Sequence, residues 1–169
     1  MNTRSPRALE RDFDTTQFRQ ALSQFATGVT VITTRLADGS FRGLTASSFN
    51  SVSLDPPLVL WSLGNVANSL PVFSGNSHYV INVLNAGQAH LAQRFSRRTD
   101  NPFEGVEYVL SRTGQPILQG ASAWFECHNR SRYPEGDHVI FVGEVEDCAC
   151  DPQSSLIFHG GQFGSTQTR

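Results

Sequence analysis

The chain has 169 residues, of which 38% are hydrophobic and 17% charged, with a net charge of −2. This length and composition are typical of one globular domain that buries a core without metal or disulfide staples. The weak acidic balance argues against nucleic-acid or anionic-membrane partners. All 13 basic residues are arginines, which excludes a Walker phosphate loop and Schiff-base chemistry on lysine.

Cysteine usage indicates a reducing compartment. An odd, low number of cysteines (Cys127, Cys148, Cys150) without a secretory leader leads us to expect a cytoplasmic protein. The C-x-C pair and His128 lack the spacing of a metal site, so we predict no metal ligands. No apolar run reaches the roughly 18 residues that a membrane span needs.

Residues 1–13 carry three arginines without apolar periodicity and are predicted to be a flexible arm before one domain at 14–169. Asp14, with Gln17 three positions later, predicts a capped helix start. Apolar residues at i, i+3, i+4 and i+7 predict that the helix buries one face: Phe18, Ala21, Leu22 and Phe25. Gly28 suits a left-handed stop after it.

The rest of the chain is predominantly β in pattern. Strands are predicted at 29–34, 41–47 (after an Asp38-Gly39 turn), 58–63, 79–84, 108–112, 121–131 and 138–148. Short helices are predicted at 64–75 and 89–95. Because strands outnumber helices and most neighbours are hairpin-connected, we predict a mainly β fold, an antiparallel barrel with flanking helices.

The stretch 43–63 combines small hydroxyl residues with a buried strand. Short polar side chains there would let a flat ligand approach the backbone closely. On pattern alone, a polar turn before a core strand explains the same residues.

Four segments, in this order, resemble the short-chain flavin reductase family, the reductase components of two-component flavin-dependent monooxygenases. They are FATGVTVITT (25–34), GLTASSFNSVS (43–53), GDHVIFVGEV (136–145) and HGGQF (159–163). The resemblance spans nearly the whole domain. It implies an FMN-binding split barrel, usually a homodimer with flavin near the subunit interface.

The resemblance also implies an activity, hydride transfer from NADH or NADPH to FMN, FAD or riboflavin, with reduced flavin passing to a separate oxygenase. Because the cofactors carry this chemistry, the lack of a catalytic triad fits it. One alternative is a split-barrel flavoprotein that keeps its FMN and reduces a corrinoid or an electron carrier. Another is a ligand-binding barrel without activity, which would not need the GDH turn.

By the resemblance, Thr45, Ala46, Ser47 and Ser51 would contact the flavin ring. His138 of the GDH turn would lie beside the nicotinamide as the catalytic residue, and its titration near neutral pH would make binding pH-sensitive. Asp137 is predicted to shape that turn.

Neutral donors at a predicted helix start are the candidates for the flavin phosphate: Ser62, Asn65, Asn68 and Ser69. The family often has a basic or hydroxyl residue there, and the neutral donors of this chain should bind the phosphate weakly. Arg94, Arg97 or Arg98 are alternatives, although a solvated helix end is the favoured explanation for them. Gly161 is predicted to let the backbone approach the ligand closely, and Phe163 to cover the flavin or pyridine ring; the family more usually has Tyr at the position of Phe163.

Overall fold

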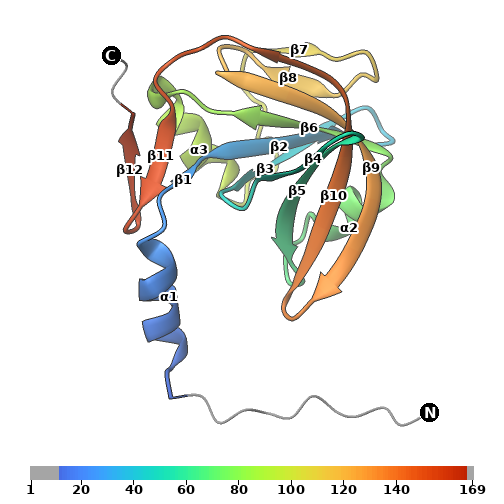
Figure 1. The fold of residues 1–169 in the computed structure, drawn as a ribbon. Helices are drawn as coiled ribbons and strands as arrows, with labels where there is room; N and C mark the ends of the chain where they lie inside the picture. Colours follow the sequence, from blue (N-terminus) through green and yellow to red (C-terminus); the bar gives the residue numbers. More distant parts are fainter. Residues whose placement is uncertain (1–11, 167–169) are drawn as a thin grey trace, which may run out of the picture.

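The computed structural model describes residues 12–166, so the predicted arm lies almost entirely outside the described residues. The described chain is mainly β (Figure 1). Its strands are β1 (Thr27–Gly28), β2 (Thr30–Arg35), β3 (Phe41–Ala46), β4 (Asn50–Leu54), β5 (Pro57–Gly64), β6 (His78–Val83), β7 (Tyr108–Leu110), β8 (Pro116–Leu118), β9 (Ala123–Glu135), β10 (His138–Cys150), β11 (Leu156–His159) and β12 (Gln162–Ser165). Its helices are α1 (Thr15–Ser23), α2 (Leu70–Gly75), the 3-10 turn η1 (Ala86–Gln88) and α3 (Ala89–Phe95).

Seven strands form the main sheet, in the order β3-β2-β6-β9-β10-β5-β4. Every pairing in it is antiparallel. The sheet curls, so that β3 at one edge contacts β5 near the other. The predicted antiparallel, mainly β fold is therefore confirmed, and the gap between β3 and β5 corresponds to the opening of a split barrel.

Aromatic side chains fill the interior of the curled sheet. Trp61 of β5 stacks on Phe141 of β10 with ring centroids 4.5 Å apart, and its edge meets Phe73 and Tyr79. All four side chains are fully buried. A second cluster packs α3 against β2 and the β8 strand on the outside of the sheet. The first core fixes β5 and β10 side by side, which matters for the site below.

Helix α1 begins as predicted, with a capping box between Asp14 and Gln17. The prediction that it buries one face is wrong within this chain, because α1 has no buried residue and Phe18 and Leu22 are about half exposed. Gly28 does not end the helix either; it lies in β1, beyond the C-cap at Gln24. As Figure 1 shows, α1 projects away from the barrel, next to the β11–β12 hairpin.

The predicted helix at 64–75 forms only over its second half. Residues 65–69 make turns, and β5 continues to Gly64 because it pairs with β10 up to His138. The pattern also missed β4, β8 and the β11–β12 hairpin, all of them short strands. No helix in the described residues is long and apolar enough to cross a membrane.

Candidate functional site

A cleft of about 800 Å³ opens between β3 and β5, where the barrel is split. Its walls come from β3, the end of β5, the 67–69 turn, α2 and the segment that follows α3. The lining residues are Arg42, Gly43, Leu44, Thr45, Leu63, Ala67, Asn68, Ser69, Val72, Phe95, Ser96, Arg97, Arg98, Thr99, Asp100 and Pro102. Its volume is that of a site for a cofactor-sized ligand.

On the β3 side, two of the residues that line the cleft are small, Gly43 and Thr45. Gly43 faces Phe95 so closely that a Cβ would lie 2.7 Å from the ring, so only glycine fits between strand and helix. Thr45 lines the cleft, but its hydroxyl donates to the Ala92 carbonyl at 2.6 Å. The backbone groups of Thr45 and the lone pairs of its hydroxyl oxygen remain available to a ligand. Ala46 is buried beneath this wall, and Ser47 follows it, exposed at the strand end.

Three arginines and one aspartate line the cleft: Arg42 at the start of the β3 wall, and Arg97, Arg98 and Asp100 in the segment after α3. Arg97 and Arg98 were alternative candidates in the sequence, where a solvated helix end was the favoured explanation, and Arg42 was not predicted. The signal for Arg42 was its position beside Gly43 at the start of the small-residue strand. Asn68 and Ser69, predicted as phosphate donors, share the cleft with these arginines. Guanidinium groups are strong phosphate partners.

The other two predicted phosphate donors have different partners. Ser62 lies within β5, and its backbone N–H donates to Ser48 Oγ at 2.9 Å. Asn65 holds the 136–138 turn, because its backbone N–H donates to Asp137 O and its amide donates to Gly136 O. The helix start predicted here does not exist, since α2 begins only at Leu70. It is too short to provide a helix-dipole site.

His138 begins β10 directly after a tight turn at Gly136, which has φ +60°. Its Nδ1 lies 2.6 Å from Asp137 Oδ1. The hydrogen bond and charge of His138 lower the pKa of the Asp137 carboxyl below its ordinary value. Asp137, predicted to shape the turn, thus also orients the imidazole. His138 pairs with Gly64, one residue after the cleft residue Leu63, and its side chain is half exposed.

The remaining predicted contacts lie on other elements. Ser51 is exposed on β4, opposite Val59. Gly161 (φ +81°) lies in the turn of the β11–β12 hairpin, and Phe163 packs on Phe158 with ring centroids 5.5 Å apart. This hairpin pairs with β1 beside α1, away from the β5–β10 end of the barrel (Figure 1). Within one chain, the structure does not bring these residues together with the cleft.

A split antiparallel barrel with a cofactor-sized cleft, lined by small polar residues and by arginines, is typical of a nucleotide-cofactor-binding protein. The chain belongs to the flavin reductase family, whose profile, "Flavin reductase like domain", matches residues 22–167.

Relatives and solved structures agree with this assignment. The FMN reductase (NADH) SmoA of Agrobacterium fabrum (strain C58) is 44% identical over 147 residues, which cover 87% of this chain and 83% of SmoA. NADH:FAD oxidoreductase SgcE6 of Streptomyces globisporus C-1027, solved with NAD and FAD fragments, has a TM-score of 0.87 and 38% identity over 91% of this chain and 93% of SgcE6. BorF, the flavin reductase component of a bacterial two-component tryptophan halogenase, has a TM-score of 0.84 and 36% identity over 92% of this chain and all of BorF.

Proposed function

We propose that this chain is an NAD(P)H:flavin oxidoreductase that binds flavin in the β3–β5 cleft and releases it, reduced, to a separate oxygenase. One observation carries the proposal: the cleft has short side chains of β3 on one side and Arg97 and Arg98 after α3 on another, and the hydrogen-bonded Asp137–His138 pair lies at the start of β10, the strand that pairs with β5. A flat ring and an anionic tail match these two sides. The bound cofactors supply the chemistry, hydride transfer from a dihydronicotinamide to flavin.

The β3 wall would hold the edge of the flavin ring. The C-terminal end of this wall consists of Thr45, Ala46 and, directly after the strand, Ser47. Their short side chains let backbone N–H and C=O groups reach a ligand. Positioning two stacked rings is itself a large contribution to rate, because it removes the entropy cost of bringing them together. In this proposal the protein contributes orientation at this wall.

The arginine side would hold the phosphate. Asn68 and Ser69 offer neutral donors from the turn before α2, and Arg97 and Arg98 add two charges from the segment after α3. Hydrogen bonds to charged groups are each worth about 1.5–3 kcal/mol. The sequence predicted weak phosphate binding from neutral donors alone; with the arginines in the same cleft we propose a firmer anchor.

His138 would position the nicotinamide. With Nδ1 held by Asp137, the ring presents Nε2 near Gly64, at the cleft end of β5. The second ring nitrogen, Nε2, can then donate a hydrogen bond to a carboxamide or a nucleotide phosphate, or accept one from a carboxamide.

A homodimer would complete the site. Apolar side chains that are 36–77% exposed cover α1, its C-terminal end and the adjoining hairpin: Phe18, Leu22, Phe25, Phe158 and Phe163. Exposed apolar patches of this kind mark interaction surfaces. We propose a second copy as the occupant, which would bring Gly161 and Phe163 of one protomer toward the cleft of its partner.

Steady-state oxidation of NADH and NADPH, measured with FMN, FAD and riboflavin in turn, tests the function. Arg97→Ala combined with Arg98→Ala should raise the KM for FMN roughly tenfold or more, as the loss of charged hydrogen bonds predicts. The KM for riboflavin, which has no phosphate, should stay unchanged. Arg112→Ala, on the far hairpin, is the control. No flavin-dependent oxidation with any pair would refute the activity.

Gel filtration of the FMN-loaded protein separates this function from the alternative of a flavoprotein that keeps its FMN. A flavin that serves as substrate is lost on the column. Retention of one FMN per chain would favour the alternative, in which the bound flavin reduces another substrate or carrier.

A further inference from the structure

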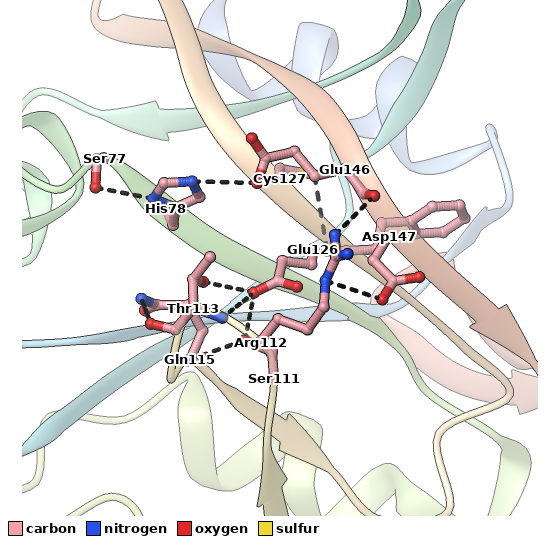
Figure 2. A network of polar contacts seen from close by, with 11 residues as sticks. Ser77, His78, Ser111, Arg112, Thr113, Gln115, Glu126, Cys127, Glu146 and Asp147 are labelled. Carbon is pink, nitrogen blue, oxygen red and sulfur yellow. Dashed lines mark hydrogen bonds and ion pairs between the residues drawn. The ribbon is translucent and has the colours of Figure 1, made fainter.

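Three potential metal ligands meet on the main sheet, away from the cleft. His78 of β6, His128 of β9 and Glu146 of β10 each place one ligand atom within 4.8 Å of the other two. His78 Nε2 lies 3.2 Å from Glu146 Oε2. Figure 2 marks this contact with a dashed line. The rings of His78 and His128 have centroids 5.3 Å apart.

The strand pairing explains why these side chains meet. His78 is directly opposite His128 in the antiparallel β6–β9 pair, so both side chains project from the same face. On β10 the register shifts between Val145 and Asp147, which leaves Glu146 as the extra residue of a β-bulge. A bulge redirects the side chain of its extra residue, here toward His78.

We propose that His78, His128 and Glu146 form a zinc site. Two imidazoles and one carboxylate are a donor set typical of Zn²⁺, with a solvent molecule in the fourth position. Bonds of about 2.0–2.1 Å in a tetrahedron set neighbouring ligand atoms roughly 3.3 Å apart. The His78–Glu146 distance already matches. His128 is exposed, so a side-chain rotation can bring its nitrogen closer.

The surroundings of His78 prepare it as a ligand. Ser77 Oγ lies 2.9 Å from His78 Nδ1. In the tautomer whose Nδ1–H donates to Ser77 Oγ, the lone pair of Nε2 faces Glu146. A hydrogen bond to the second nitrogen is the usual way in which proteins orient a metal-binding histidine.

Charge also favours a divalent cation here. Glu126, two residues before His128 and on the same face of β9, is buried, and its Oε2 has no hydrogen-bond partner among the described residues. Asp147 pairs with Arg112 nearby (Figure 2). With Glu146 this part of the sheet carries three carboxylates and the one guanidinium of Arg112, a difference of two negative charges.

No metal ligands were predicted from the sequence, because the candidates that lie close together along the chain lack the spacing of a metal site. These three residues are separated by 50 and 18 positions (78 to 128, 128 to 146), and only the register of β6, β9 and β10 unites them. A bound ion would therefore link three neighbouring strands of the main sheet.

Isothermal titration of tag-free protein with ZnCl₂ tests the proposal. The parent carries Cys148→Ser and Cys150→Ser, since both thiols are exposed and could bind zinc themselves. We expect one Zn²⁺ per chain, with affinity reduced at least tenfold by His78→Ala or His128→Ala. Ser77→Ala should weaken binding about tenfold, the usual effect of losing a partner of a metal-bound histidine. His90→Ala, an exposed histidine elsewhere, is the matched control.

A melting experiment gives a second readout. Saturating Zn²⁺ should raise the Tm of the parent but not of the His128→Ala variant, because a ligand that binds only the folded chain stabilises it. His128 is exposed, so this variant should fold normally without zinc. No zinc binding by the parent, or binding that survives His78→Ala together with His128→Ala, would overturn the proposal.

Discussion

His138 and Asp137 act as one unit at the start of β10. The Asp137 carboxylate holds His138 Nδ1 in place. A substitution of Asp137 therefore frees the orientation of the imidazole, and a substitution of His138 removes the imidazole. We predict that His138→Ala raises the KM for NADH about tenfold, the size of one lost hydrogen bond to a charged or polar group, and raises the flavin KM less. Steady-state kinetics measure both constants.

Asp137→Asn should show a smaller change in the same direction, because the imidazole remains but its orienting charge is lost. Glu135→Gln, which alters the residue opposite His138 on the same turn, is the control. An unchanged NADH KM in His138→Ala would remove His138 from the site.

Gly143 shows why one residue of the FVGEV segment must be glycine. A Cβ there would overlap Tyr79 Oη and lie 2.9 Å from Cys127 Cβ, and both neighbours are buried. We predict that Gly143→Ala costs about 2 kcal/mol through overpacking. For a domain of this size that lowers the Tm by roughly 4–8 °C.

Differential scanning calorimetry measures the effect. Gly75→Ala is the matched control, since nothing lies within 4 Å of a Cβ at that position. Equal melting temperatures for the two variants would contradict the prediction, because they would show that the core rearranges to accept the extra methyl group.

At the scale of elements, Glu126 joins the β7–β8 hairpin to the main sheet. Its Oε1 accepts hydrogen bonds from Ser111 Oγ and from the N–H and hydroxyl of Thr113 (Figure 2). Burial opposes ionisation, but these hydrogen bonds outweigh it and lower the pKa of Glu126. The ionised carboxylate therefore stabilises the fold.

The sign of the pH dependence follows from that lowered pKa. The stabilisation is fully present above the unfolded value of about 4.3 and is lost as the pH falls through the lower folded value. We predict that Glu126→Gln makes the free energy of unfolding less dependent on pH across this acid range. Urea titrations at several pH values measure it, with Glu104→Gln, at an exposed residue, as control. Parallel curves for wild type and Glu126→Gln would contradict the prediction.

Elements were predictable where a local signal sets them. The β2–β3 hairpin follows from Asp38-Gly39, and the start of α1 from its capping box. The helix expected at 64–75 failed in its first half because pairing with β10 extends β5 to Gly64, a tertiary interaction that no local pattern contains. Strands of three to five residues, such as β8, are too short for their alternation to be distinctive.

At the scale of the whole molecule, the barrel was predictable and the assembled site only in part. Three of the predicted site residues, Thr45, Asn68 and Ser69, line the cleft, and their contacts with a ligand stay predictions. Arg42 comes from β3 and Arg98 from the loop beyond α3, and the packing of α3 against β3 brings them together. Contacts between segments that are far apart in the sequence cannot be predicted from the spacing of residues along the chain.

The last prediction concerns the surface that this chain leaves uncovered. Helix α1 is tied to the hairpin through its end, where the Gly160 N–H donates to the Ser23 carbonyl at 2.9 Å, yet none of its residues is buried. A helix whose apolar residues face solvent gains little stability by itself. A second copy of the chain would cover these residues and provide that stability.

We therefore predict that Phe18→Ser combined with Leu22→Ser converts a dimer into a monomer. Each side chain contributes about 1.5 kcal/mol or more when buried, so the pair should weaken association about a hundredfold or more. Light scattering after gel filtration measures the mass, and Val109→Ser, at an exposed apolar residue on β7, is the control. If Phe163 reaches the partner's cleft, flavin KM should rise as the dimer is lost; a wild-type monomer at micromolar concentration would refute the assembly.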